Sequence, residues 1–322
     1  GDKRKHRLKD RHVVKIMTGA PLAAGADAVI PIEYVTAESA HVIIKDKPRA
    51  GAFVRPPGND ITAGQSLFQK GEFLTPADIG VLASVGLTEV TVVPRPRIAL
   101  ISTGSEIIGP GEKLEHGQIY DSNMPVLYSL LASDRYPVAT QRRVSTNERG
   151  PLLKTLRECL GNHDLVISTG AVSMGDYDFI PQIVTALGGD TLFHRVAVKP
   201  GKPTLMAGFK DSWLISLPGN PVSSVVGYFL YVRRVVSLLT GVPREPQRAI
   251  ATLAGELIVR GDRLNIVGAR LESAAEGLVA HPAVRQESGR LSSARGINGL
   301  IFIEAGDRTL PAGSQVLVEL TN

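Results

Sequence analysis

Short hydrophobic runs separated by glycine- and proline-rich turns occupy the first part of the chain. Residues 13–16 and 42–44 have the apolar, β-branched character of strands, and turn-forming residues at 18–21 and 56–60 lie beside them. The regular spacing of Gly and Pro favours short strands over helices. The pattern therefore predicts a small all-β unit over residues 11–60.

A short helix is predicted after this unit. Thr75 and Pro76 are residue types preferred at the N-cap and at the first helical position, and apolar residues then recur on one face as far as Ser84. Gly86 is expected to end the helix. The prolines at 94 and 96 then mark a boundary.

Apolar runs and helical spacing alternate beyond this boundary. Four runs are typical of buried strands: residues 98–102, 164–168, 195–199 and 213–217. Apolar residues at helical spacing predict helices over residues 123–133, 148–161, 179–187 and 222–240. Strand, glycine-containing loop and helix in alternation predict an α/β sheet covered by helices on both faces.

The pattern changes again after residues 243–246, which carry two prolines. Residues 247–322 contain short alternating segments, such as 249–253 and 316–320, between Gly-rich turns. No long helix is evident there. We therefore expect a small β-barrel or sandwich at the end of the chain.

Composition narrows the class of protein. A length of 322 residues corresponds to two or three domains, and 43% apolar against 21% charged residues is sufficient for a buried core. The single cysteine, Cys159, excludes a disulfide-stapled scaffold and favours a reducing compartment. Without a run of 18 apolar residues or a signal peptide, a soluble cytoplasmic protein is expected. Because Gly1 leads directly into strand-like residues, we expect a fragment or a protein processed upstream.

The net charge of +5 comes from one segment. Residues 3–15 hold seven of the 36 Lys and Arg but one of the 31 Asp and Glu, which leaves 29 basic and 30 acidic residues elsewhere. The segment is either a solvated strand or arm, or a contact for an anion. Nucleic-acid binding is disfavoured because aromatic stacking partners and a basic remainder are lacking.

Candidate chemistry lies in loops at strand ends, where ligands bind to open α/β sheets. In the loop 168–178, Gly170 and Gly175 allow close approach of the backbone to an anion and Ser173 adds a hydroxyl donor. Its two aspartates, one of them Asp178, suit a hard cation such as Mg²⁺. The alternative is a tight turn in which Asp178 caps the next helix.

Three further loops carry polar groups. Lys199 and Lys202 lie in a loop stiffened by two prolines, which suits a phosphate or pterin phosphate but equally an exposed turn. Residues 217–223 open into a helix, and their two prolines are hard to explain as a generic turn. Residues 102–106 offer a helix-terminal anion site with one carboxylate, and residues 120–123 favour an N-cap.

Seven groups of residues together resemble one family. They are 16–21 with 25–29, 58–61, 102–106, 119–123, 168–178, 199–203 and 217–223. In their order and spacing, over essentially the whole chain, they resemble the molybdopterin molybdenumtransferases of molybdenum cofactor biosynthesis, which include the E domain of gephyrin-like proteins.

The resemblance implies an α/β multidomain subunit of four parts. These are an N-terminally incomplete β-rich region over residues 1–58, a linking helical region over 59–96, a molybdopterin-binding α/β domain over 97–242 and a C-terminal β-barrel over 243–322. It also implies an elongated homodimer in which the partner chain completes each active site.

The reaction implied by the resemblance takes adenylylated molybdopterin and molybdate. It cleaves the adenylyl-phosphate bond, releases AMP and inserts molybdenum into the dithiolene with Mg²⁺ present. The molybdopterin adenylyltransferase is an expected partner. The implied catalytic residues are Glu106, Asp178, Asp60 and Thr18, with Asp178 and Glu106 on the metal. The implied cofactor-binding residues are Thr103, Gly104, Gly170, Ser173, Gly175, Lys199, Lys202, Pro218, Asn220 and Pro221.

Several departures from the family pattern bear on activity. The family's Asp-Asn-Ser-Ala-Met-Asp-Gly-Tyr-Ala segment does not precede residues 18–21, so a site carboxylate is expected to be missing. Ser105 and Thr146 occupy positions of family carboxylates, and Gly268 that of an arginine. A molybdopterin-binding or scaffolding module without turnover is the alternative. The adenylylating relative is disfavoured because it needs neither residues 1–96 nor 247–322.

Overall fold

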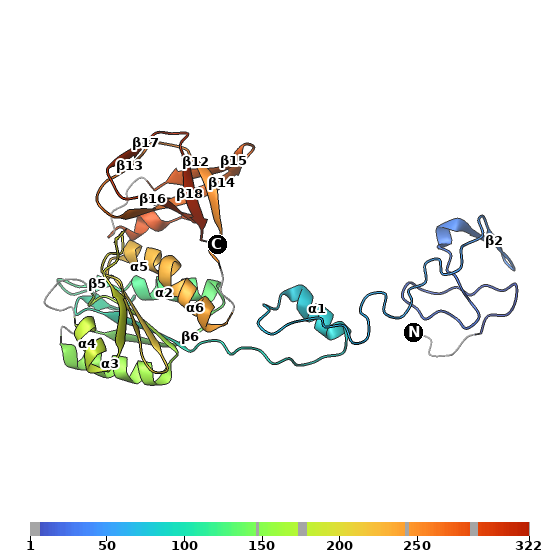
Figure 1. Cartoon of the computed structure of the whole chain (residues 1–322), viewed down its shortest axis with the longest axis horizontal. Helices are drawn as coiled ribbons and strands as arrows, with labels where there is room; N and C mark the ends of the chain where they lie inside the picture. The colour runs from blue at the N-terminus through green and yellow to red at the C-terminus, as the bar shows by residue number, and fades with distance from the viewer. Residues whose placement is uncertain (1–6, 146–147, 173–178, 242–244, 284–288, 322) are drawn as a thin grey trace. The chain divides into compact units, whose positions relative to one another are not determined.

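The computed structural model describes residues 7–145, 148–172, 179–241, 245–283 and 289–321 (Figure 1). The chain divides into two compact units, residues 1–70 and residues 71–322. The division into four parts at 58, 96 and 242 stays a prediction.

The first unit is built mainly from turns. Its regular elements are a 3₁₀ turn, Ile32–Tyr34, and an antiparallel pair of strands, β1 (Val35–Ala37) and β2 (Val42–Ile44). Strand β2 confirms the prediction for residues 42–44. The predicted strand at residues 13–16 is wrong: these residues belong to no strand, and Val13 is 56% exposed. A strand pattern has no effect without a neighbouring strand to pair with.

The predicted helix near the start of the second unit is confirmed as α1 (Pro76–Ser84). Thr75 and Asp78 form a reciprocal capping box, in which the Thr75 side chain accepts from the Asp78 N–H and the Asp78 carboxylate accepts from the Thr75 N–H at 2.7 Å. Gly86 follows the helix with φ of +84°, a conformation that glycine adopts without strain.

A six-stranded sheet forms the centre of the second unit, in the order β6, β3, β7, β11, β10, β8. The strands are β3 (Ile98–Thr103), β6 (Val138–Val144), β7 (Leu165–Thr169), β8 (Asp190–His194), β10 (Leu205–Gly208) and β11 (Trp213–Leu217). Strands β6, β3, β7 and β11 are parallel, and β10 pairs antiparallel to both β11 and β8. The predicted α/β sheet is confirmed, with an antiparallel edge.

Helices cover both faces of this sheet (Figure 1). They are α2 (Asn123–Ser133), α3 (Arg149–Asn162), α4 (Ile180–Ala186) and a continuous run of α5 (Pro221–Gly227), a π-helical turn (Tyr228–Val232) and α6 (Arg233–Leu239). In β3, Ile98 and Leu100 pack with α2 and the last helix, whereas Ala99 and Ile101 pack with α3 and α4. A strand buried on both faces needs such a continuous apolar run.

The helical run 221–239 is, by length and composition alone, long and apolar enough to cross a membrane. Half of it is buried inside the protein, however, and Val226, Val232 and Val236 belong to the core beneath the sheet. Burial also raises the pKa of Tyr228, whose hydroxyl donates to the Asp134 carboxylate at 2.6 Å. The composition of this segment is explained by a core helix.

The C-terminal region is a closed β-barrel, as predicted. Its strands are β12 (Arg248–Leu253), β13 (Leu257–Val259), β14 (Leu264–Ala274), β15 (Gly277–Pro282), β16 (Gly299–Ile303), β17 (Arg308–Leu310) and β18 (Gln315–Leu320). The order β15, β12, β18, β16, β14 closes through a pairing of β14 with β15, and β13 pairs separately with β17. Ile266 and Leu300 face outward and join the core of the α/β domain, so the barrel docks there.

One strand prediction is wrong in an informative way. Residues 195–199 do not form a strand of the α/β sheet: the edge strand β8 ends at His194, and Arg195 has φ of +65°. Val198 and Lys199 form the two-residue strand β9, which pairs in parallel with β14 of the barrel. The apolar pattern showed a strand but could not show which sheet would receive it.

Candidate functional site

A cleft of about 1420 Å³ separates the strand ends of the α/β domain from the barrel. On one side are the residues that follow β3, β7 and β11, where the carboxyl ends of parallel strands meet. The lysine loop, residues 199–203, and barrel residues between Ile258 and Ile266 close the other side. The cavity exceeds the usual 300–1,000 Å³ of a small-molecule site, which leaves room for a nucleotide-sized ligand.

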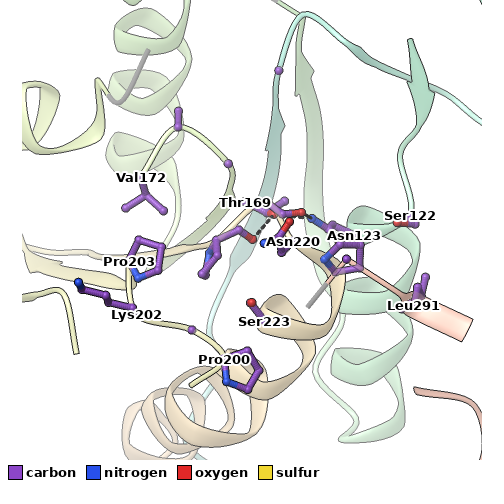
Figure 2. A pocket seen from close by; sticks show the side chains of 18 of the residues that line it. Ser122, Asn123, Thr169, Val172, Pro200, Lys202, Pro203, Asn220, Ser223 and Leu291 are labelled. Carbon is purple, nitrogen blue, oxygen red and sulfur yellow. Dashed lines mark hydrogen bonds between the residues drawn. The ribbon is translucent and has the colours of Figure 1, made fainter. Parts of the chain in front are cut away.

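Buried hydrogen bonds fix the α/β side of the cleft. The Asn123 amide donates to Thr169 Oγ1 at 2.8 Å and to the Gly219 carbonyl at 2.7 Å (Figure 2). Thr103 Oγ1 donates to the Thr169 carbonyl at 3.0 Å, and Thr169 Oγ1 donates to the Pro218 carbonyl at 3.2 Å. These bonds join the start of α2 to the ends of β3, β7 and β11. Because a broken bond would leave a buried polar group unpaired at a cost in free energy, these bonds hold the three loops together.

The backbone at Gly170 lies against the end of β3. A Cβ atom added to Gly170 would lie 2.6 Å from Thr103 Oγ1 and 2.7 Å from the Thr103 carbonyl oxygen, and its φ is +90°. Both the close approach and the left-handed conformation therefore require glycine. The next residue, Ala171, also has positive φ, at 51°.

Glu106 brings a carboxylate to the cleft from the turn after β3. This turn is held by a bond from the Ile107 N–H to the Gly104 carbonyl and by one from the Ile119 N–H to the Glu106 carbonyl at 2.8 Å. Asp121, nearby, is buried, and its Oδ1 accepts from the Met124 N–H at 3.0 Å, which agrees with the expected cap at the start of α2.

Positive charge enters the cleft from two domains. Lys199 and Lys202 come from the loop between β8 and β10, and Arg260 and Arg263 come from the barrel. The Lys199 ammonium donates to the Arg260 carbonyl at 3.2 Å. The Lys202 side chain is exposed. Figure 2 shows it on a different loop from those that carry Asn123 and Thr169. Four cations around one cavity attract an anionic ligand.

The structure brings most of the expected residues together. The cleft is lined by Thr103, Gly104, Glu106, Gly170, Lys199, Lys202, Pro218, Asn220 and Pro221. Thr18 and Asp60 belong to the first unit, residues 1–70. Ser173, Gly175 and Asp178 lie outside the described residues. Within the described part of the chain, no three His, Cys, Asp or Glu side chains form a group able to hold a metal ion.

Sequence reasoning missed several residues of the cleft. Asn123 was expected to serve a helix cap, whereas its amide connects two strand-end loops. Arg260 and Asn265 carried no signal at all, because they reach the cleft from the barrel. Arg263 also reaches the cleft from the barrel and lies near Gly268, the position at which the family carries an arginine.

Comparison with known proteins now gives the family. Residues 1–86 match the MoeA N-terminal region (domain I and II), residues 99–238 a probable molybdopterin binding domain, and residues 251–321 the MoeA C-terminal region (domain IV). Molybdopterin molybdenumtransferase from Staphylococcus aureus (strain MSSA476) is 30% identical over 97% of this chain and 74% of its own. The Staphylococcus epidermidis enzyme is 31% identical over 98% and 75%. The chain belongs to the molybdopterin molybdenumtransferase family.

Solved structures agree with this assignment. The crystal structure of the molybdopterin biosynthesis moeA protein from Pyrococcus horikosii superposes with a TM-score of 0.79, over 100% of this chain and 79% of that one, at 28% identity. A molybdenum cofactor biosynthesis protein from Pyrococcus furiosus, 20% identical, shares the fold with a TM-score of 0.59 over 82% of both chains. The resemblance read from the sequence is thereby confirmed, and the protein is a molybdenumtransferase of molybdenum cofactor biosynthesis.

Proposed function

We propose that this molybdenumtransferase acts on adenylylated molybdopterin and molybdate, inserts molybdenum into the dithiolene and releases AMP. The observation that carries the proposal is the convergence of four cations and three strand-end loops on one cleft of about 1420 Å³. A nucleotide-linked pterin is long and anionic, and therefore needs both the volume and the charge. Homology by itself supports molybdenum transfer, without the adenylylated substrate or the release of AMP.

The cationic side of the cleft is assigned to the phosphates and to molybdate. Lys199 and Lys202 are three residues apart on a loop whose Gly201 carbonyl accepts from Thr204 Oγ1 at 2.8 Å, so the loop is anchored at its base. Fixed ammonium groups stabilise charge that develops on oxygen when the adenylyl-phosphate bond breaks. Thr103, Gly104, Gly170, Ser173, Gly175, Pro218, Asn220 and Pro221 are proposed to shape the pterin side.

The carboxylate side is assigned to Mg²⁺. Glu106 is positioned on the cleft, and Mg²⁺ in proteins is held by one or two carboxylates together with substrate phosphates, so the donors fit the ion. Asp178 is proposed as the second carboxylate. When bound, the cation would neutralise phosphate charge. Asp60 and Thr18 are proposed as further catalytic residues, on the family resemblance alone.

The cationic assignment is tested with a pair of lysine variants. Lys202→Met should reduce both AMP release and molybdenum insertion about 100-fold, because a charge-assisted contact to the transferring group is lost. Lys210→Met is the matched control, since Lys210 is also exposed but lies outside the cleft. Equal activity of the two variants, measured in vitro with adenylylated molybdopterin, molybdate and Mg²⁺, would contradict the assignment.

The carboxylates are tested by Asp178→Asn and Glu106→Gln. Each should lower molybdenum insertion and raise the Mg²⁺ concentration needed for half-maximal activity. Retained insertion with normal Mg²⁺ dependence would remove that residue from the metal site. Tight binding of molybdopterin without any turnover by the unmodified protein would instead select a binding or scaffolding module.

We also propose a cytoplasmic homodimer that receives its substrate from the molybdopterin adenylyltransferase. Exposed apolar side chains support a partner surface: Phe73, Ile79, Leu87 and Val92 are between 52% and 67% exposed. Light scattering during size exclusion should give twice the 34.3 kDa mass of the chain. A monomer at micromolar concentration would contradict this part of the proposal.

A further inference from the structure

The lysine loop is held by two different domains. At its C-terminal end, the Val196 N–H donates to the Lys202 carbonyl at 2.8 Å and the Arg195 N–H donates to the Thr204 carbonyl. These bonds hold Lys202 to the residues that follow β8 of the α/β sheet. At the N-terminal end of the loop, Lys199 lies in strand β9 and pairs with Asn265 of the barrel. The two cations of one short loop are therefore positioned by separate bodies of the protein.

Three contacts with the barrel fix the N-terminal end of the lysine loop. The Leu264 N–H donates to the Ala197 carbonyl at 3.0 Å, and the Arg263 guanidinium donates to the Val198 carbonyl at 3.3 Å. The Lys199 ammonium itself donates to the Arg260 carbonyl at 3.2 Å. Backbone and side chain of Lys199 are thus both set by residues 260–265.

Asn265 stiffens the barrel segment that makes these contacts. Asn265 is 4% exposed, and its side-chain amide donates to the Arg263 carbonyl at 2.9 Å. The segment is in turn fixed to the α/β domain, because Ile266 and Leu300 are buried in the same apolar cluster as the helix 221–239, with Val198 packed against them. Docking of the barrel and placement of Lys199 therefore share one set of contacts.

We infer that the C-terminal barrel positions Lys199 for anion binding, so that docking of the barrel and anion binding in the cleft are energetically coupled. The barrel then acts as a positioning element as well as a wall. The inference rests on the proposed function, in which Lys199 binds a phosphate or molybdate. By linkage, docking of the barrel raises the affinity for the anion by some factor, and binding of the anion raises the equilibrium constant for docking by the same factor.

The test uses a residue outside the cleft. Leu300 is 1% exposed at the docking face and does not line the cavity, and Leu253, 2% exposed inside the barrel, is the matched control. In the full chain, Leu300→Ala should raise the dissociation constant for molybdate about fivefold or more, measured by titration calorimetry, and Leu253→Ala less than twofold. Leu300→Met, which conserves volume, should restore the affinity.

A second readout does not depend on anion binding. Amide hydrogen exchange of residues 196–202 should become faster in Leu300→Ala and stay unchanged in Leu253→Ala, and saturating molybdate should slow exchange in residues 264–266 of the unmodified protein. Equal effects of the two alanine variants on either readout would overturn the inference. If the alanine variants fail to fold, Leu300→Val and Leu253→Val make the same comparison with a smaller cavity.

The two readouts distinguish a failure of the proposed anion site from a failure of the proposed coupling. If the unmodified protein binds no molybdate, the anion site of the proposed function is wrong, and the exchange of residues 196–202 still decides whether the barrel holds the loop. If molybdate binds equally to the protein and to Leu300→Ala while exchange becomes faster, the anion site stands and the coupling is refuted.

Discussion

The two walls of the cleft hold their polar groups in different ways. On the α/β side, Thr103, Asn123 and Thr169 are at most 9% exposed and bond to one another or to adjacent carbonyls. On the barrel side, the Arg260 side chain is 69% exposed and pairs with the equally exposed Asp307 at 3.5 Å. The α/β wall holds a buried network, whereas the barrel wall presents the charge of Arg260 on a solvated side chain.

The α/β wall therefore sets the shape of the cleft, and the barrel wall contributes charge to it. A buried network transmits any change of one member to the others, because an unpaired buried group costs free energy. A solvated arginine contributes little to folding but still acts on an anion through its field. The comparison therefore predicts that substitutions in the buried network of the α/β wall lower stability, whereas substitution of the exposed barrel residue Arg260 lowers affinity without lowering stability.

The largest effect is expected for Gly170→Ala. Its Cβ would collide with Thr103 at 2.6–2.7 Å and the residue would have to keep φ of +90°, so we expect a loss of about 3 kcal/mol. Gly188→Ala is the control, because Gly188 also has positive φ, +74°, but open space around it, and should lose about 1 kcal/mol. Urea denaturation measures both. Similar losses would mean that the close approach to Thr103 is relieved by movement.

Asn123→Ala should follow. Removing its amide leaves the buried Thr169 hydroxyl with one bond fewer and the Gly219 carbonyl without this donor, at a cost of about 2 kcal/mol. The control is Asn162→Ala, whose amide donates to the Glu158 carbonyl on the surface and whose loss should cost under about 0.5 kcal/mol. If denaturation midpoints of the two variants coincide, the network does not rigidify the wall.

A smaller effect is expected at the opposite end of the same sheet. There Arg97 donates to Asp164 at 2.7 and 3.0 Å, and these bonds and the charge hold the pKa of that carboxyl below its usual range. A lowered pKa contributes stability that is complete above the unfolded pKa of about 4 and is lost as the pH falls through the folded value. Because both side chains are partly exposed, the contribution is well under about 1 kcal/mol.

Asp164→Asn tests this pair. The variant should unfold at nearly the same urea concentration as the unmodified protein below pH 3, and at a slightly lower one at pH 7. A loss above about 2 kcal/mol at pH 7 would show that exposed pairs of the α/β domain act like its buried network.

The smallest effect on stability is expected for Arg260→Gln. Its exposed ion pair with Asp307 should contribute under about 0.5 kcal/mol. Molybdate affinity should nevertheless fall about threefold at low salt, and less at high salt, because the lost charge acts through a screened field. A variant that unfolds more easily but binds normally would reverse the comparison of the two walls.

Local patterns were sufficient for much of the fold. The capping box at Thr75 and the buried strands at residues 98–102, 164–168 and 213–217 were all predicted from neighbouring residues and are confirmed. These elements depend on interactions within a few positions or on burial of an apolar run. The strand at 13–16 failed because its formation needed a partner strand that the sequence does not specify.

The site was predictable to the same extent. Loops at the carboxyl ends of parallel strands meet at one edge by geometry, so Thr103, Gly170 and Pro218 were expected together and line one cleft. Asn123 was undervalued because a helix-start asparagine usually serves its own helix. Its bonds to Thr169 and Gly219 span 46 and 96 residues.

The sequence by itself therefore determined the alternation of strands and helices, a small β unit at the end of the chain, the family and the glycine- and lysine-bearing loops. Only the tertiary structure decided that Val198 and Lys199 leave the α/β sheet to pair with Leu264 and Asn265, and that Arg260 reaches the same cleft. The physical reason is that a strand pattern encodes burial and direction, whereas the choice of partner strand depends on how two domains dock.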